Sequence, residues 1–344
     1  MGRSKVLVVY VELSILKVSV SLRKPLYTVP MVTASKHGEE NVFGNEALEK
    51  DESWQLAWLH GGDAQPELHK DLFRFVFKQT KVQKALGKCK SIVIPYQCIL
   101  GEAGEGLMVY SRNIIYSIGK LSLRPYCTGE DRLSLVGRHK LGLRFSFNIS
   151  GNITSIWSCD QFEGIPVYPG FIRVGFETIL NLFIKLLCEK GYDFTAQRDR
   201  LFCEKLVMDY CYVALDFEKE LERIENLDGP LHEVKLEDGT VLELGKECIV
   251  ATEILFNPRL VGMDEKSIMS LFQRQNIIPS YGCVNVIFSG GCAPALKGLG
   301  ERIQRELETM DDKYIVTPVN IIKTDVREDA IRFSKMRSLN QVMF

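Results

Sequence analysis

Few segments of this sequence carry the residue types and spacing that catalysis requires. The glycine-rich segment GEAGEG (101–106) is the nearest match to a phosphate-binding loop. A P-loop needs Lys-Ser/Thr directly after its glycines, because these side chains contact the phosphates and the metal ion, and a dinucleotide loop needs its own full glycine pattern. Neither condition is met here. A kinase-like phosphate loop at 101–106 is therefore a weak hypothesis.

The cysteines also lack the arrangement of a metal or redox centre. All 10 are spread singly along the chain, and none forms a CxxC pair or a Cys/His cluster with zinc-ligand spacing. Most lie in apolar runs, where cysteine behaves as a small hydrophobic residue. We predict no metal site, and free thiols in a reducing compartment.

The composition is that of a folded intracellular protein. The chain has 344 residues, of which 46% are hydrophobic and 25% charged, with a formal net charge of −1. This charge gives no electrostatic reason to expect nucleic acid or an anionic membrane as a partner. Glu12 and Lys17 interrupt the apolar run after MGRSK. We therefore expect no secretion signal and no membrane span.

The chain contains two strand-rich segments, one at its start and one near its middle. The first has strands near 5–12, 15–22 and 26–33, and the second, beginning near residue 142, has about three strands by its alternation and turn signals. The second contains the turn signal Ser150-Gly151-Asn152, whereas VLVVYVELSILKVSV (6–20) has no Gly, Pro, Asn or Asp where its turn must lie. The open question is what forms that first turn.

The remaining pattern alternates helices with further strands. Strands are predicted at 91–96 and 283–291, and Asp238-Gly239 marks a hairpin. The polar stretch 35–53 indicates a loop or a small exposed subdomain. Helices are predicted at 70–86, 106–124, 176–190, 195–225, 299–310 and 327–344. Because each half opens with a meander and then turns helical, the sequence indicates a duplicated α/β fold with a cleft between two lobes.

Three stretches resemble actin. They are EKGYDFTAQRDRLFCEKLVMDYCYVALDFEKELERI (189–224), LEDGTVLELGKECIVATEILFNPRLVGM (236–263) and FSGGCAPALKGLGERIQREL (288–307). The resemblance covers most of 163–310, and outside that region only spacing and hydrophobic pattern correspond. The chain is similar to a divergent actin-related protein rather than a conventional actin.

The resemblance implies the two-lobed fold shared by actin, sugar kinases and Hsp70 ATPases, with a central cleft and four subdomains. Subdomain 1 would comprise 1–30, 65–140 and 317–344, and a reduced subdomain 2 would comprise 31–64. Subdomain 3 would comprise 141–172 and 258–316, and subdomain 4 would comprise 173–257.

In this family two hairpins grip the phosphates of ATP, with a divalent ion beside them. The first hairpin has an Asp and a Gly-Ser-Gly-like turn, because glycine lets backbone N–H groups approach phosphate oxygens. Here these positions are Tyr10–Ser14, so the carboxylate and the glycines are lost and Glu12 would repel phosphate. Lys17 matches the family's phosphate-contacting lysine.

The second hairpin and the adenine side are equally altered. The family's Asp-Ser-Gly-Asp-Gly corresponds to Asn148–Asn152, where both carboxylates have become amides that carry no charge for a metal ion. The family's glycine pair near adenine survives as Gly290-Gly291. The residues that could still contact a nucleotide are Ser14, Lys17, Ser150, Gly151, Asn152, Gly290 and Gly291.

The positions needed for hydrolysis are replaced as well. The family's water-orienting Gln and His correspond to Ile118 and Trp157, and its adenine-contacting Lys and Glu correspond to Val207 and Met208. None of these residues can polarise water or hold adenine. We predict no catalytic residues, a pseudo-ATPase and no firmly held cofactor. ATP or ADP with Mg²⁺ or Ca²⁺, kept as structural glue, is the alternative.

The function left by these losses is that of a fixed, actin-shaped subunit. The segments 35–53 and 262–275 are too short for the family's filament contacts, so long homopolymers are not expected. We predict a structural subunit of a nuclear chromatin-remodelling or histone-modifying complex. The alternatives are a filament-end subunit of the dynactin pointed-end type and a nucleotide-binding cytoskeletal filament protein.

The predicted partners follow from this role. They are actin, other actin-related proteins and further complex subunits, in the nucleus or in the cytoplasm with the cytoskeleton. Neither a membrane nor direct nucleic-acid contact is expected, since the basic run KVQKALGKCK (81–90) is typical of a solvated face. The partner surface would be lined by parts of 111–126 and by the C-terminal helix 327–344, which also has apolar residues that could pack into its own lobe.

Overall fold

The computed structural model describes most of the chain. The described residues are 5–59, 66–89, 91–96, 124–129, 144–159, 166–236, 238–274, 284–309 and 319–334. The glycine-rich segment 101–106 lies outside them, as does the helix predicted at 106–124 except for its last residue. In the part of the chain that is described, no helix is long and apolar enough to cross a membrane.

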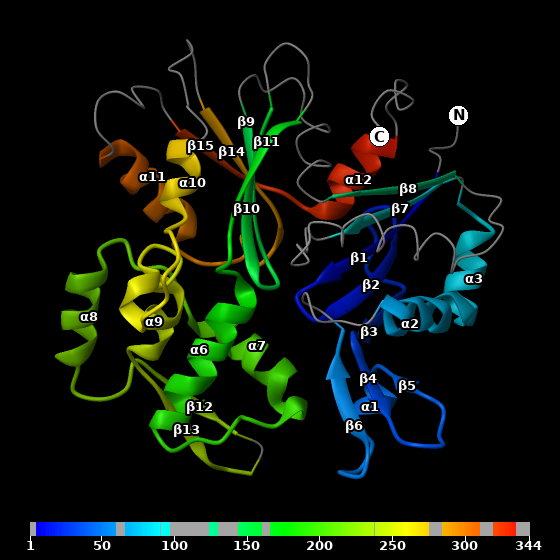
Figure 1. Cartoon of the computed structure of the whole chain (residues 1–344), viewed down its shortest axis with the longest axis horizontal. Coiled ribbons are helices and arrows are strands. Elements are labelled where there is room, and N and C mark those ends of the chain that lie inside the picture. Colours follow the sequence, from blue (N-terminus) through cyan, green and yellow to red (C-terminus); the bar gives the residue numbers. More distant parts are fainter. Residues whose placement is uncertain are drawn as a thin grey trace.

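Two five-stranded sheets with one topology form the centres of two lobes (Figure 1). In each, a three-stranded antiparallel meander is followed by two parallel strands. The first sheet has the order β3-β2-β1-β7-β8, with β1 (Val6–Glu12), β2 (Ile15–Val20), β3 (Tyr27–Pro30), β7 (Ser91–Tyr96) and β8 (Arg124–Gly129). The second has the order β11-β10-β9-β14-β15, with β9 (Arg144–Ser150), β10 (Ile153–Cys159), β11 (Pro166–Ile172), β14 (Val284–Gly291) and β15 (Val319–Lys323). This repeat confirms the predicted duplicated α/β fold.

Helices cover both faces of the first sheet, because β1 is apolar on both sides. Leu7 and Val9 pack into a core with helices on one face, whereas Val6, Val8 and Tyr10 pack against a helix on the other face. The helices on the first face are α2 (Pro66–Lys78) and α3 (Thr80–Leu86), and the helix on the second face is α12 (Val326–Ser334). The described part of the predicted C-terminal helix therefore packs into its own lobe, through Ala330 and Ile331.

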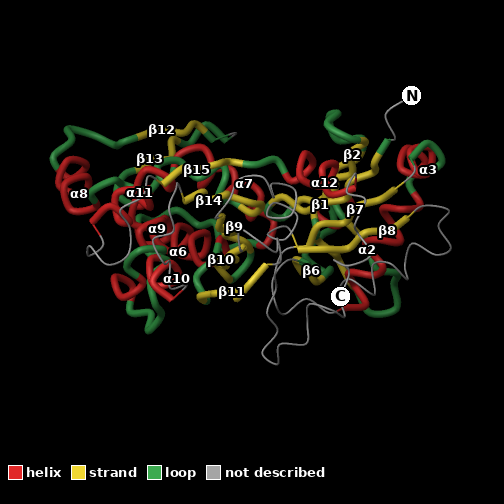
Figure 2. Tube along the Cα trace, turned by 90° about the horizontal axis from the view of Figure 1, so that it is seen from above, coloured by secondary structure: helices red, strands yellow, loops and turns green. Residues whose placement is uncertain are grey.

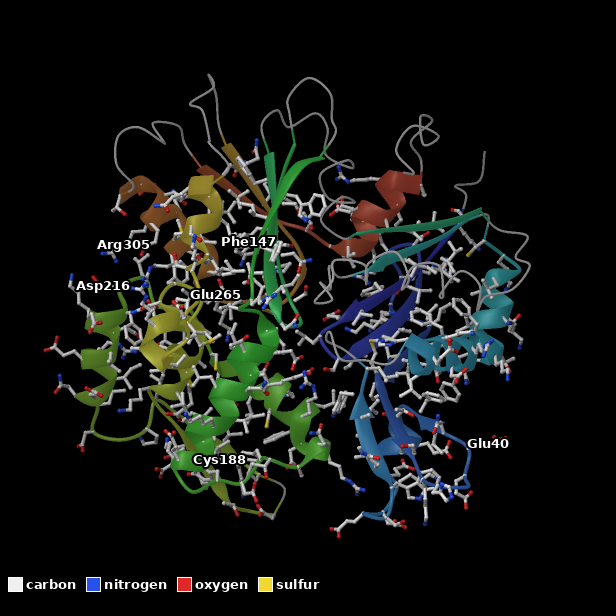
Figure 3. All side chains as sticks on the ribbon, in the orientation of Figure 1. Glu40, Phe147, Cys188, Asp216, Glu265 and Arg305 are labelled. Atoms are coloured by element: carbon white, nitrogen blue, oxygen red, sulfur yellow. The ribbon has the colours of Figure 1, made fainter. Side chains whose placement is uncertain are left out.

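The second lobe has the larger core. Phe147 lies in it (Figure 3) with its ring centroid 5.9 Å from that of Phe272 and 5.7 Å from that of Phe288. The α-helices of this lobe are α6 (Phe176–Glu189), α7 (Arg200–Tyr210), α8 (Phe217–Glu225), α9 (Glu247–Glu253), α10 (Met269–Arg274) and α11 (Leu299–Thr309). Seen from above, the two lobes lie side by side (Figure 2).

Two small sheets extend the lobes. One joins β4 (Val32–Ser35), β5 (Val42–Phe43) and β6 (Gln55–Trp58), with the short helix α1 (Asn45–Leu48) against it. The polar stretch 35–53 thus forms part of a small subdomain, the second of the two predicted alternatives. The other sheet is the hairpin of β12 (His232–Lys235) and β13 (Val241–Leu244), at the predicted Asp238-Gly239 turn.

Two of the predicted helices are interrupted, one of them by tertiary contacts. The helix predicted at 195–225 is replaced by a short 3-10 turn, α7 and α8, and the chain between α7 and α8 is extended. In that break Tyr212 N–H donates to the carbonyl of Cys248 (3.2 Å) and Val213 N–H donates to the carbonyl of Lys297 (2.9 Å). The helix predicted at 70–86 begins four residues earlier and is interrupted at Gln79, whose backbone is extended. Helical propensity is a weak preference that such packing overrides.

Candidate functional site

The first hairpin turn has an unusual residue at its tip. Strands β1 and β2 pair out to Glu12 and Ile15, which leaves Leu13 and Ser14 as a two-residue turn. Leu13 has a φ of +53°, the conformation in which such turns normally place glycine. Its side chain packs against the core of the second lobe, and Ser14 is fully buried. The turn of 6–20 is therefore stabilised by contacts across the lobes rather than by local turn chemistry.

The charged and aromatic residues of this hairpin are engaged within the protein. The Lys17 Nζ lies 2.6 Å from a carboxylate oxygen of Glu12, so the matched phosphate-contacting lysine has an anion on its own hairpin. Tyr10, at the position of the family's metal-side Asp, is 5% exposed and packs with the α12 face of the first lobe. Both side chains serve the hairpin and its core.

The second hairpin keeps a glycine turn. Gly151 has a φ of +40°, and a Cβ added there would meet no atom within 4 Å. Its carbonyl accepts a hydrogen bond from the Glu177 N–H (2.7 Å), which ties the turn to the start of α6. Ser150 and Asn148 are buried, and Asn152 is exposed. The predicted turn at 150–152 is thus present, with Ser150 on its buried side and Asn152 in solvent.

Gly291, the second glycine of the pair at the end of β14, has a packing role. Gly291 has a φ of +56°, and a Cβ there would lie 1.8 Å from the carbonyl oxygen of Ile149. The next residue, Cys292, donates its N–H to that same carbonyl (2.9 Å). Gly291 therefore lets β14 seat directly against the second hairpin, and Gly290 precedes it in the same strand.

The structure brings the tips of the two hairpins together around one small cavity. Its volume is about 10 Å³, and its lining includes Leu13 from the first hairpin and Ser150, Gly151 and Gly291 from the second lobe. A space of this size holds about one water molecule. Among the sequence-predicted residues, Ser150, Gly151 and Gly291 meet here, whereas Lys17 points to Glu12 and Asn152 to solvent. This cavity does not fit the phosphates of a nucleotide.

The positions of hydrolysis and adenine binding are occupied by packing residues. Trp157 and Ile322 both pack against Ile287, and Val207 is fully buried. Met208 packs against the core of the second lobe. Ile118 lies outside the described residues. In the residues that the structure describes, no group of three or more His, Cys, Asp or Glu side chains could hold a metal ion.

A polar network that sequence reasoning missed closes the first hairpin onto α7. The Glu204 carboxylate accepts a hydrogen bond from the Ser14 N–H (3.3 Å) and another from the Ser14 hydroxyl. The Arg200 Nε lies 3.0 Å from both the Ser14 Oγ and a Glu204 oxygen, and the same guanidinium pairs with Glu177. The Arg200 guanidinium also lies over the Trp58 ring, 5.5 Å from its centroid. Arg200 therefore connects the first hairpin, α6, α7 and the small sheet of the first lobe.

This network is shielded from water. The side chains of Arg200, Glu177 and Glu204 are 13%, 18% and 4% exposed. Beside the network, on the first hairpin, Glu12 pairs with Lys17. The one sequence signal for the network is the Arg-Glu spacing of four on a helix, which predicts an ion pair but not its contact with Ser14.

Comparisons with known proteins agree with the resemblance drawn from the sequence. No protein-family model matches the chain. It is similar to centractin of Schizosaccharomyces pombe, 27% identical over 164 residues, which are 44% of this chain and 43% of that protein. It is also similar to actin-related protein 2 of Caenorhabditis briggsae, 27% identical over 176 residues, with 44% and 42% covered. Each match spans less than half the length of the curated relative.

Proposed function

We propose, from the premise that this chain is a divergent actin-related protein with the actin-like fold, that it is a non-catalytic structural subunit of a multiprotein complex. The observation that carries the proposal is the close packing of the two hairpin tips against each other. Leu13 and Ser14 occupy the place of a phosphate-binding turn, and about 10 Å³ is left beside them. At the hairpin tips that the structure describes, a phosphate group would have to displace Leu13 and break the hydrogen bonds of Ser14.

The chemistry of the described residues supports the absence of ATP hydrolysis. Hydrolysis needs a positioned base or water-orienting group, and Trp157 with its apolar neighbours provides none. A divalent ion needs charged oxygen ligands, and buried Asn148 and exposed Asn152 carry no charge. Lys17 is paired with Glu12. The remaining property is shape, held by two large cores.

Two kinds of assembly are proposed for this subunit, both inside the cell. The first is a nuclear chromatin-remodelling or histone-modifying complex, with actin or actin-related proteins among its subunits. The second is the end of a filament built from actin-related proteins, and the similarity to centractin favours keeping this candidate. Both assemblies require the same rigid actin-like fold, so the fold does not distinguish them. The subunits that copurify with the chain do.

Affinity purification of the tagged chain from its own cells tests the proposal. We expect stoichiometric copurification of other subunits and an ATPase rate at background. Lys17→Ala is the matched control, because any residual rate from contaminating ATPases would be the same in this variant. Recovery of the chain alone, with ATP turnover that Lys17→Ala reduces, would contradict the proposal.

A further inference from the structure

We propose that Ser14, Glu204 and Arg200, with Leu13 beside them, form a latch that holds the two lobes closed without a nucleotide. In this latch the Glu204 carboxylate takes the place of phosphate at the first hairpin. The inference rests on the proposed function, because a subunit that turned over ATP would have to break these contacts in each cycle.

The geometry at Ser14 is that of an anion site filled by the chain itself. A backbone N–H and a hydroxyl at a hairpin tip form a donor set suited to an anionic oxygen. Here both groups donate to the two oxygens of one carboxylate, Glu204. That carboxylate comes from a residue 190 positions away, on a helix of the other lobe. The tip therefore needs no external anion.

Arg200 neutralises the buried carboxylate and extends the latch. Its guanidinium contacts Glu204, the Ser14 hydroxyl and Glu177, and covers the Trp58 ring. The Trp58 indole N–H in turn donates to the carbonyl of Gln197 (3.0 Å), one turn before α7. A buried carboxylate is tolerated only when such partners satisfy it. The latch thus joins the hairpin and the small sheet of the first lobe to α6 and α7 of the second.

Leu13 adds an apolar contact to the polar one. It packs against the second core and lines the residual cavity together with Ile149 and Phe176. Separation of the lobes would expose this apolar surface and at the same time break the hydrogen bonds that join Ser14 to Glu204 and Arg200. The closed arrangement is therefore expected to persist whether ATP is present or not.

Hydrogen–deuterium exchange of the full chain, with and without millimolar ATP and Mg²⁺, tests the latch. In the wild type we expect slow exchange over residues 10–16 that ATP does not change. In Arg200→Ala we expect exchange over 10–16 to rise roughly tenfold or more, because Glu204 is left buried without its cation. Glu204→Gln, which keeps the volume and loses the charge, should raise it by less.

The control is a buried ion pair inside one lobe. Arg302 pairs with Glu253 at 3.3 Å, and the two side chains are 11% and 5% exposed. Arg302→Ala should raise exchange in 247–256 and 299–307 and leave 10–16 unchanged. If Arg200→Ala does not fold, Arg200→Lys, which keeps the charge and loses the fork of donors, replaces it.

Two results would overturn the latch. One is wild-type protection over 10–16 that increases with ATP and Mg²⁺, and the other is unchanged exchange there in folded Arg200 and Glu204 variants. Neither result depends on copurification with other subunits. A failed latch with intact copurification would leave the proposed function standing. The reverse outcome would remove only the membership in a complex and keep the latch, which rests on the absence of ATP turnover.

Discussion

The two central hairpins share one backbone design and differ in the residue at the tip. In each, a paired residue on either side encloses a two-residue turn whose first member has a positive φ, Leu13 at +53° and Gly151 at +40°. Gly151 faces open space, whereas Leu13 packs into the opposite lobe. The same geometry thus serves as an ordinary turn in one lobe and as an interlobe contact in the other.

The difference shows how a ligand loop can become a structural contact. A left-handed conformation costs a non-glycine residue about 1–2 kcal/mol. Burial of a leucine side chain contributes about 1.5–3 kcal/mol when complete. The two terms are of similar size, so packing against the second lobe offsets the strain at Leu13. A phosphate-binding turn could not make this exchange, because its glycines must leave room for the ligand.

The largest expected effect lies where the second hairpin meets β14. In Gly291→Ala the added Cβ would lie 1.8 Å from the Ile149 carbonyl oxygen, and the positive φ adds strain. We expect a loss of more than about 4 kcal/mol in unfolding free energy, measured by denaturant titration. Gly191→Ala, also at positive φ but with open space around it, should cost only about 1–2 kcal/mol. Equal losses would show that the close approach is not what requires Gly291.

The second prediction concerns the pH dependence of the buried Arg302–Glu253 pair in the second lobe. Burial raises the pKa of Glu253 from 4.5 to about 7, although Arg302 acts to lower it. The folded state therefore favours the neutral acid, and this stabilisation is present below about pH 4.5 and lost as pH rises through 7. Relative to Glu253→Gln, which stays neutral, the wild type should lose up to about 3 kcal/mol over that range. The measurement is the melting temperature of the wild type and of Glu253→Gln between pH 5 and 8. The same pH dependence in both proteins would contradict this assignment.

The third prediction concerns Leu13 itself and reverses the usual order of substitutions. Leu13→Ala loses the interlobe packing and keeps the strained φ, so we expect a loss of about 2 kcal/mol. Leu13→Gly loses the same packing and relieves the strain, so it should be more stable than Leu13→Ala by about 1 kcal/mol. Thermal unfolding of the three proteins side by side measures this order. A glycine variant less stable than the alanine variant would mean that Leu13 is not strained.

The smallest effect is expected at the tip of the second hairpin. Gly151→Ala meets no neighbouring atom, so only the left-handed conformation of the backbone opposes it. The loss should be about 1 kcal/mol, with exchange over 10–16 unchanged. A larger loss, or altered exchange at the first hairpin, would show that the two tips are coupled more tightly than their contacts indicate.

Much of this architecture follows from local sequence pattern. Alternation predicted β1 and β2, and turn residues marked the second meander, whereas the strand predicted at 26–33 divides into β3 and β4 of two different sheets. Gly191 follows the end of α6 at a φ of +94°, as a helix-terminating glycine does. The similarity to centractin and to actin-related protein 2 agrees with the resemblance drawn from the sequence. The residue boundaries of the four subdomains stay a prediction.

The latch could not be predicted in the same way. Leucine has no turn propensity, and its positive φ is set by packing against a lobe far away in sequence. The partner of Ser14 lies 190 residues along the chain, so no local spacing reveals it. The pair Arg200 and Glu204 looks like any exposed i,i+4 pair until the fold buries it. The resemblance therefore points to the hairpin positions that differ from the family, but not to the contacts that Leu13 and Ser14 make there.

The most direct test is the nucleotide content of the native protein. The chain is purified gently, heated to release any bound nucleotide, and the supernatant is separated by chromatography. We predict far less than one nucleotide per chain, because Leu13 and the Ser14–Glu204 bonds occupy the site. Recovery of one ATP or ADP per chain would contradict the account, because a phosphate group and the Ser14–Glu204 contact cannot occupy the same hairpin tip.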